Sequence, residues 1–253
     1  MENHKYEELR EEIRDIFYEH KERYGYRRIT LELRRKGVLA NHKLVLKLMN
    51  EMGLKGKVKR KKYNSYKGDV GKDAPNVLKR DFKANRPCEK WTTDVSQFTL
   101  GEEKLFLSPI LDMFNGEIIS FNISKSPNFR QTMLMLEEAL NKYENLSGLV
   151  IHSDQGWQYR QKEYQKALES RGIRQSMSRK GNCLDNSMME NFFGIIKNEM
   201  FYGHEKEFSS LAELELAIRN YIDYYNNKRI KLRLDGMSPV EYRTYFEKCE
   251  GLV

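Results

Sequence analysis

The sequence is short of cysteine and of long apolar runs, and each shortage argues against a class of protein. Its 253 residues contain three cysteines, Cys88, Cys183 and Cys249. They are widely spaced and odd in number, which argues against a disulfide framework and against a zinc knuckle. No apolar run approaches the roughly 18 residues of a membrane span, and the opening residues, MENHKYEELREE, are too polar for a signal peptide. We therefore expect a cytoplasmic protein without membrane contact.

The excess of positive charge lies in one segment. The net charge of +8 by itself favours a polyanionic partner only weakly. Residues 55–86 hold twelve Lys or Arg and three acids, whereas the rest of the chain holds 33 bases and 34 acids. The segment has few large apolar residues and no periodicity, so we interpret it as a linker, either solvated or in contact with phosphates. The concentration of charge favours phosphate contact, and its four consecutive bases are Lys59, Arg60, Lys61 and Lys62.

The N-terminal residues predict three helices. Apolar residues recur at helical spacing over residues 3–21, and further helices fit residues 27–36 and 42–52. Asn41 suits an N-cap for the third helix, and Gly53 suits its stop. The second and third helices resemble a helix-turn-helix, which would place the third helix in a DNA groove. A plain helical hairpin fits the same pattern equally well.

After the basic segment the pattern changes to strands and helices. Strands are predicted at residues 90–99, 104–112, 117–124, 149–153 and 173–178. Helices are predicted at residues 129–143, 161–171, 185–200 and 211–227, the last with a capping box between Ser210 and Glu213. Three strands followed by alternating helix and strand are typical of an α/β domain with a mixed sheet.

The predicted helix DNSMMENFFGIIKNEM, residues 185–200, carries a narrow polar strip beside its apolar stripe. At about 100° per residue, the strip contains Asn186, Glu190, Gly194 and Lys197. The stripe, which should face a core, contains Met189, Phe192, Phe193, Ile196 and Met200. Gly194 costs the helix about 1 kcal/mol relative to Ala, which indicates that something approaches its backbone closely. An ordinary amphipathic helix with a surface charge pair fits this stretch too.

Three carboxylates fit a site for phosphoryl chemistry. Asp94 lies inside the first predicted strand, where an acid is disfavoured. Asp154 follows the fourth predicted strand, at the carboxyl end where open α/β sheets gather their chemistry. Buried together with Glu190 they would repel one another, unless Mg²⁺, which prefers carboxylate oxygens and water, neutralises them. Each acid alone fits a cap or an ion pair, whereas the trio favours a two-metal site.

The residues around these acids resemble a known family. Asp154 and Glu190 are separated by 35 residues, which is the spacing of the DDE transposases and retroviral-type integrases. The bacterial insertion-sequence transposases made from OrfA and OrfB are the most similar, and the chain resembles their OrfB part over essentially its whole length. The segments that carry the resemblance are WTTDVS, VIHSDQGWQY, SMSRKGNCLDNSMMENFFGIIKNE, YYNNKRIKLRLDGMSPVEY and, near the N-terminus, YGYRRITLELRRKG.

The resemblance implies a transposase that cuts insertion-sequence DNA ends and transfers the strands. Asp94, Asp154 and Glu190 would be its catalytic residues and would bind two Mg²⁺ ions, or Mn²⁺ as a substitute. Lys197 and Arg229 would contact DNA, as would the basic segment. The implied partners are the element's ends, target DNA, further copies of the chain on that DNA, and the OrfA product as a fusion or partner. The implied location is the cytoplasm, at the nucleoid.

The implied fold class is α/β, with a ribonuclease H-like mixed sheet flanked by helices and a small all-helical N-terminal domain. We expect a helix-turn-helix-like DNA-binding domain at residues 1–54, the basic linker at 55–86, the catalytic core at 87–200 and a helical extension at 201–253.

The sequence departs from the family at some positions and leaves other roles open. Lys231 stands where the family often has a His, so no role of that His carries over. No cysteine precedes Cys88, so the zinc module of retroviral integrases is absent from this sequence, and no segment resembles OrfA. Asn186 either caps its helix or orients Glu190, and His152 either packs or contacts substrate. Two aromatic residues fit either a core or base stacking, Trp157 and Tyr159.

Two other functions fit parts of the pattern. A nuclease with the same fold would cut DNA without joining strands, and a DNA-binding regulator would use the N-terminal helices above an inert core. The complete acid trio argues against the regulator.

Overall fold

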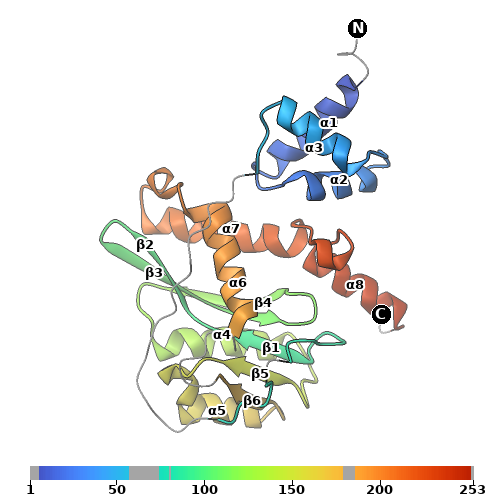
Figure 1. Cartoon of the computed structure of the whole chain (residues 1–253). Helices are drawn as coiled ribbons and strands as arrows, with labels where there is room; N and C mark the ends of the chain where they lie inside the picture. Colours follow the sequence, from blue (N-terminus) through green and yellow to red (C-terminus); the bar gives the residue numbers. More distant parts are fainter. Residues whose placement is uncertain (1–5, 57–73, 80, 179–185, 252–253) are drawn as a thin grey trace.

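The computed structural model describes residues 6–56, 74–79, 81–178 and 186–251. Figure 1 shows a small helical domain at the top, the C-terminal helices beneath it, and a sheet flanked by helices below them. Among the helices of these described residues, none has the length and apolar character needed to cross a membrane.

The N-terminal domain consists of the three predicted helices. They are α1 (Glu7–Glu19), α2 (Tyr26–Arg35) and α3 (His42–Glu51). The side chain of Asn41 accepts a hydrogen bond from the backbone N–H of Lys43, so Asn41 is the N-cap of α3, as predicted. The apolar side chains of the three helices form a core that also takes in Ile230, from the other end of the chain. The domain is therefore completed by a C-terminal residue.

The sheet is mixed, as predicted. Its strands are β1 (Lys90–Thr93), β2 (Ser96–Leu100), β3 (Glu103–Asp112), β4 (Ile118–Ser124), β5 (Val150–Ser153) and β6 (Arg174–Met177). β3 pairs antiparallel with β1, β2 and β4, whereas β5 lies parallel to β1, and β6 lies parallel to β5. The prediction of one strand at residues 90–99 is wrong in one respect, because the structure has two strands there, β1 and β2.

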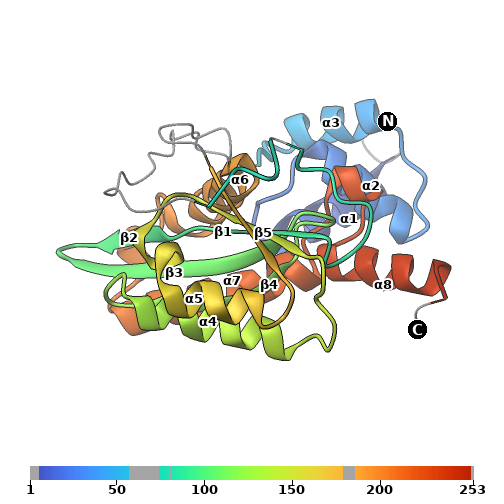
Figure 2. The ribbon, with the colours of Figure 1, turned by 90° about the horizontal axis from the view of Figure 1, so that it is seen from below.

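Helices cover both faces of this sheet. The long helices are α4 (Phe129–Asn141), α5 (Lys162–Glu169), α6 (Ser187–Ile196), α7 (Leu211–Asn227) and α8 (Pro239–Cys249). Side chains alternate along a strand, so Leu107 and Ile118 point to the core under α6 and α7, whereas Ile110 and Ile119 point to the core under α4 and α5. Figure 2 shows α4 and α5 together on one side of the strands and α6 on the other.

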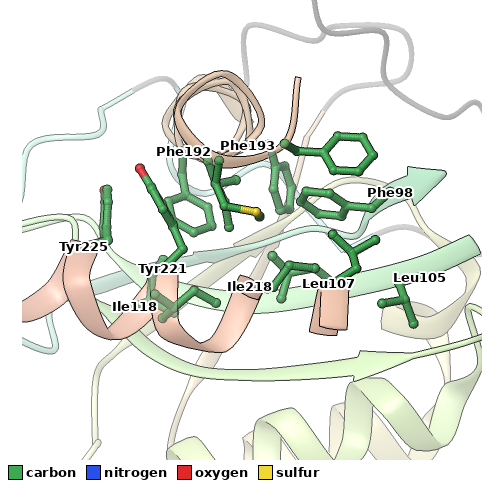
Figure 3. Packing of buried hydrophobic residues seen from close by; sticks show 14 of the residues in the cluster. Phe98, Leu105, Leu107, Ile118, Phe192, Phe193, Ile218, Tyr221 and Tyr225 are labelled. Atoms are coloured by element: carbon green, nitrogen blue, oxygen red, sulfur yellow. The ribbon is translucent and has the colours of Figure 1, made fainter. Parts of the chain in front are cut away.

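Helix α7 shares its core with α6 and the sheet. In Figure 3, Phe192 and Phe193 from α6 meet Phe98 and Leu107 from the strands, and Ile218 from α7 closes the same cluster. Complete burial of one such side chain contributes about 1.5–3 kcal/mol. Residue 200, where we expected the catalytic core to end, is therefore not a boundary between two cores. The capping box predicted between Ser210 and Glu213 is half formed at the start of α7. The Ser210 hydroxyl accepts a hydrogen bond from the backbone N–H of Glu213, but the Glu213 carboxylate accepts one from the N–H of Ser209 and not of Ser210.

The last part of the predicted linker is attached to the core. Leu78 is buried beside Met113 and Val150. The backbone N–H groups of Val77 and Leu78 donate to the Ser176 hydroxyl at the edge strand β6. This part of the chain is therefore not a free, solvated linker. Residues 57–73 of the predicted linker lie outside the described residues.

Candidate active site

Asp94 and Asp154 lie at the ends of two neighbouring parallel strands. In the pairing of β1 with β5, Thr92 lies opposite His152. The same register, continued by two residues, sets Asp94 opposite Asp154. Both carboxylates therefore stand at one level, at the carboxyl edge of the sheet. The structure brings these two predicted residues together.

A proline explains why β1 ends just before Asp94. The strands β1 and β2 pair with β3 in one continuous register, and this register would set Asp94 opposite Pro109. Proline has no N–H to give to a ladder. Asp94 is therefore in a break between two strands, and our expectation that it lies inside a strand is corrected. In place of a ladder partner, its carboxylate accepts a hydrogen bond from the backbone N–H of Val95 at 2.7 Å.

Burial and mutual repulsion disfavour negative charge at this pair. Burial raises the pKa of Asp94 well above its ordinary value, and the negative charge of Asp154 adds to this rise. Glu190 contributes in the same direction, whereas the Val95 N–H and the positive charge of Lys197 oppose it. Burial also raises the pKa of Asp154, against a hydrogen bond from the Gly156 N–H. A bound cation would relieve this repulsion.

A row of buried polar side chains lies directly behind the two carboxylates. The register of the three parallel strands aligns Thr92, His152 and Ser176, all of them closed to solvent. A ring nitrogen of His152 lies 2.9 Å from the Ser176 hydroxyl. The structure therefore gives His152 a packed position inside the sheet, one of the two roles left open by the sequence.

Asn186 does not cap its helix, and its hydrogen bonds fit the other role expected for it, the positioning of α6 and Glu190. Its side chain makes no capping hydrogen bond to α6. Its amide oxygen instead accepts a bond from the Thr92 hydroxyl at 2.5 Å, and its amide nitrogen lies 3.3 Å from the backbone carbonyl of Thr93. Asn186 thus ties the first turn of α6 to the strand that ends at Asp94.

Glu190 is held beside the pair by the apolar stripe of α6. Met189, Phe192, Phe193 and Ile196 are buried in the core that α6 shares with the sheet (Figure 3). Partial burial raises the pKa of Glu190. In the part of the chain that the structure describes, no three His, Cys, Asp or Glu side chains are grouped so that they could hold a metal ion. The carboxylates of Asp94 and Asp154 form a pair, and Glu190 is their neighbour on another element.

The exposed side of α6 carries a hollow of about 470 Å³. It is lined along one helix face by Glu190, Asn191, Gly194 and Asn198. Apart from its chain neighbours and the nearby backbone of its own helix, a Cβ atom added to Gly194 would have no described protein atom within 4 Å. The close approach that we predicted at Gly194 is therefore not made by the described part of this chain, and the space beside the helix backbone is open.

Lys197 is not a solvated surface charge. It is buried, at the start of a short π-helical turn, η3 (Lys197–Phe201), that continues α6. Its ammonium lies 5.2 Å from the centre of the Phe98 ring. Burial lowers its pKa to about 8, although the negative charge of Asp94 acts in the opposite direction. The interaction with Asp94 shows that Lys197 belongs to the surroundings of the carboxylate pair.

Arg229 is an internal residue, and our expectation of a DNA contact there is corrected. Its side chain is closed to solvent, and its guanidinium donates to both carboxylate oxygens of Glu199, at 2.6 and 2.8 Å. The Tyr221 hydroxyl donates to the same carboxylate. Because this guanidinium is buried and paired with Glu199, a DNA phosphate cannot reach it.

The remaining candidates have separate positions. Trp157 is 48% exposed, whereas Tyr159 is fully buried, so core packing is the role of Tyr159. The ammonium of Lys231 is buried and donates to the carbonyls of Asn115 and Gly116, which ties the C-terminal segment to the turn between β3 and β4. The four consecutive bases and one cysteine lie outside the described residues: Lys59, Arg60, Lys61, Lys62 and Cys183.

Sequence reasoning missed the residues that support the site from behind. Thr92 and Ser176 are small polar residues inside strands, and Glu199 is an acid near the end of a helix. Thr92 had a usable signal, because it lies two positions before Asp94 and so shares its sheet face, whereas Ser176 has no acid two positions after it. Glu199 had no such signal, since its partners lie far away in the sequence.

Comparison with known proteins gives consistent matches along the chain. An HTH-like domain matches residues 5–62, and integrase core domains match residues 84–183 and 190–245. The putative transposase InsK for insertion sequence element IS150 of Escherichia coli is 52% identical over 94% of this chain and 84% of its own length. The transposase for insertion sequence element IS904 of Lactococcus lactis is 37% identical over 94% of both chains.

Solved structures agree on the fold. The catalytic core domain of HTLV-2 integrase, determined in complex with magnesium, is 22% identical and covers 63% of this chain and 98% of its own, with a TM-score of 0.50. At this identity the likeness concerns the fold alone. The mixed sheet with its flanking helices is thus the fold of a retroviral integrase core.

Proposed function

Because this chain belongs to the insertion-sequence transposases with an integrase core domain, we propose that Asp94, Asp154 and Glu190 are its catalytic residues and hold two divalent cations. The enzyme class is that of the family, a polynucleotidyl transferase that acts in DNA transposition. The proposed reaction cuts the ends of the element and joins them to target DNA. The observation that carries this assignment is the common level of Asp94 and Asp154 at the carboxyl edge of the sheet.

The donor set suits Mg²⁺. Carboxylate oxygens are the ligands that this hard cation takes from proteins, with water in the remaining positions, and Mn²⁺ accepts the same ligands. The buried pair of Asp94 and Asp154 carries the repulsion that a divalent cation offsets. When bound, such cations activate the attacking water or 3′-hydroxyl and stabilise the leaving oxygen of an in-line displacement.

The protein's own backbone and side chains position these ligands. The Val95 and Gly156 N–H groups fix the two aspartates by hydrogen bonds. Asn186 fixes α6 against β1, which sets the distance between Glu190 and Asp94. Lys197 supplies a positive charge close to Asp94, where an arriving DNA phosphate would increase the negative charge.

DNA contacts complete the proposal. We propose that residues 1–54 bind DNA, that residues 87–200 carry the chemistry, and that the helices of residues 201–253 support them. Replacing Lys59, Arg60, Lys61 and Lys62 by neutral residues should make DNA binding less sensitive to salt. The slope of the logarithm of the binding constant against the logarithm of the salt concentration should fall in magnitude by about 0.9 for each phosphate contact that is lost. We further propose that copies of the chain assemble on the DNA at the nucleoid, and that an OrfA product joins them as a fusion or partner.

The test is strand transfer by a Glu190→Gln variant. Because the substitution removes one carboxylate and keeps the shape of the side chain, it should abolish Mg²⁺-dependent cutting and joining of the element's ends while DNA binding persists. The matched control is Glu137→Gln, which changes an exposed acid on α4 and should leave both activities unchanged. Strand transfer by Glu190→Gln at the rate of the unchanged chain would contradict the metal assignment.

Two products distinguish the other candidate functions. A nuclease would release cut ends but form no joined strand, with or without the OrfA product. A regulator would bind the ends without metal-dependent cutting. Joined strands that disappear in Glu190→Gln favour the transposase over both.

A further inference from the structure

The N-terminal domain and the segment between α7 and α8 meet at a basic pocket. It has a volume of about 370 Å³ and lies between the N-terminal domain and the C-terminal segment. Four of its residues, Arg27, Thr30, Leu31 and Arg34, come from α2, and His42 begins α3. The opposite wall consists of Leu232 and Asp235, from the chain between α7 and α8.

This wall is a fixed part of the N-terminal domain. The backbone N–H of Ile230 donates to the Tyr24 hydroxyl at 2.9 Å, and the Ile230 side chain is fully buried in the core of the domain. At Gly236, with φ of +78°, an added Cβ would lie 3.3 Å from the side chain of Leu31, so the backbone packs closely on α2. The Arg35 guanidinium donates to the Gly236 carbonyl at 3.1 Å. The pocket is therefore built into the fold and does not depend on a loose tail.

The charge of the N-terminal domain is concentrated on the side of the pocket. Helix α1 carries six acids and two arginines, whereas α2 carries four arginines and one glutamate. An anionic partner is therefore repelled from α1 and attracted to α2. Acidic proteins and nucleic acids share this attraction, but the domain's resemblance in sequence to an HTH-like domain favours nucleic acid.

Two basic side chains of the pocket, Arg27 and His42, lie next to the ring of Tyr26. Arg27 and Arg34 are seven residues apart and so lie on one face of α2, about 10 Å apart along its axis. The Arg27 guanidinium donates to the Tyr26 hydroxyl at 3.1 Å, and the Tyr26 ring stacks on His42 at 6.3 Å between ring centres. Within the described residues, neither Arg27 nor Arg34 takes part in an ion pair, so both charges can serve a ligand.

We propose that this pocket holds the phosphate backbone of duplex DNA beside Arg27 and Arg34, and that Leu232 completes the DNA-binding surface of the N-terminal domain, whereas the Asp235 carboxylate in the same wall has the wrong charge to contact a phosphate. The choice of DNA rests on the proposed function. Guanidinium groups recognise phosphates through paired N–H donors. Because His42 is the first residue of α3, a phosphate held here would set the position of α3 on the duplex without reading its sequence. The C-terminal segment would thus take part in end binding as well as in folding.

The first test measures DNA binding by the full chain without metal, so that no strand is cut. We expect the double variant Arg27→Gln/Arg34→Gln to bind a labelled duplex of the element's end, and one of scrambled sequence, more weakly by the same factor. The slope of the logarithm of the binding constant against the logarithm of the salt concentration should fall in magnitude by about 2, or about 1 for each phosphate contact that is lost with its arginine. The matched control is Arg14→Gln/Lys21→Gln, which removes the same charge from exposed positions outside the pocket and should change the slope by less than half as much.

The second test examines the C-terminal wall. Leu232 is 49% exposed, and Leu216, on α7, is 58% exposed, so a glutamate at either position is compatible with folding. Leu232→Glu should weaken binding to both duplexes several-fold, because it places a carboxylate where the phosphate would lie. Leu216→Glu adds the same charge away from the pocket and should bind like the unchanged chain. Equal thermal midpoints of the two variants would confirm that folding is not the cause.

Three results would overturn the proposal. The first is an unchanged salt slope in Arg27→Gln/Arg34→Gln, and the second is equal DNA affinity of Leu232→Glu and Leu216→Glu. A loss of self-association without a loss of DNA affinity would likewise assign the pocket to a protein partner. Since binding is measured without metal, a failure of strand transfer in the unchanged chain would contradict the proposed function and leave this result intact.

Discussion

Glu199 joins the N-terminal domain to the helix that carries Glu190. Its carboxylate accepts two hydrogen bonds from Arg229, and the Arg28 guanidinium of α2 lies 3.7 Å away. The backbone carbonyl of the same residue accepts a bond from the Arg23 side chain. One residue, nine positions after Glu190, thus holds together three parts of the chain.

A Glu199→Gln substitution should therefore destabilise the protein strongly. It leaves the buried charge of Arg229 without a counter-charge, and breaking one partner of a buried ion pair costs about 3–5 kcal/mol. The free energy of unfolding, measured by urea denaturation, tests this. The control is Glu215→Gln, which breaks the exposed pair between Glu215 and Arg219 and should cost less than about 1 kcal/mol. Equal costs for the two variants would contradict the role given to Glu199.

His20 makes the stability of the domain interface dependent on pH. Burial lowers its pKa to about 4 from an ordinary value of 6.5, although the nearby Glu19 acts in the opposite direction. The ring stacks on Tyr24 at 3.8 Å and lies within hydrogen-bond distance of the Tyr224 hydroxyl on α7. The folded protein therefore keeps His20 neutral where the unfolded chain takes up a proton.

Because the unfolded chain binds the extra proton, the free energy of unfolding should fall as the pH is lowered from about 6.5 to about 4. At about 1.4 kcal/mol for each unit of pKa difference, the loss from His20 is at most about 3.5 kcal/mol. A His20→Gln variant should be less stable at pH 7 but should show a shallower decline over this range. His204→Gln, which changes an exposed histidine paired with Glu207, should keep the full decline. An equally steep decline in His20→Gln would count against this role.

Asn186 should matter for catalysis because it positions α6. An Asn186→Ala substitution leaves the buried Thr92 hydroxyl and the Thr93 carbonyl without this partner, which costs about 1–3 kcal/mol. It also frees the first turn of α6, so Glu190 is held less firmly relative to Asp94. We expect the rate of strand transfer to fall while the apparent affinity for DNA is unchanged.

The comparison variant for this prediction is Ser120→Ala. Ser120 is also buried, and its hydroxyl donates to the carbonyl of Met135 on the opposite face of the sheet. It should lower stability by a similar amount without slowing strand transfer, once the assay is run well below the melting temperature. If both variants slow strand transfer equally, loss of stability explains the effect, and Asn186 has no positioning role.

The elements and the carboxylates could be predicted because their signals are local. Periodicity located the helices of residues 26–51, and the position of Asp154 after a strand located the edge of the sheet. The break at Asp94 could not be predicted, since it depends on Pro109, which only the pairing of β1 with β3 brings opposite. Local sequence carries no information about such a partner.

The charged residues were harder to assign than the fold. Arg229 and Lys231 look like surface bases in the sequence, yet both are buried by contacts with distant segments. Charge alone does not tell a phosphate ligand from half of an internal ion pair, because the deciding partner, such as Glu199 for Arg229, is set by tertiary structure. Exposed bases therefore have to be identified from the fold before any of them is assigned to DNA.

Gly194 offers a test of what lies against α6 when the protein acts. Apart from its chain neighbours and the nearby backbone of α6 itself, nothing in the described chain lies within 4 Å of the Cβ that an alanine would add. Within a helix, alanine is favoured over glycine by about 1 kcal/mol. Gly194→Ala should therefore raise the free energy of unfolding by up to this amount. If DNA approaches the helix backbone at the hollow beside Glu190, the same variant should carry out strand transfer more slowly.

The opposite signs of the two effects make this prediction strict, because a variant that is more stable and yet slower cannot owe its slowness to unfolding. Asn220→Ala provides the control: it raises helix propensity at an exposed position of α7, and should raise stability without changing strand transfer. A Gly194→Ala protein that is more stable and fully active would show that DNA keeps clear of this backbone. Glycine there would then be required neither for folding nor for strand transfer.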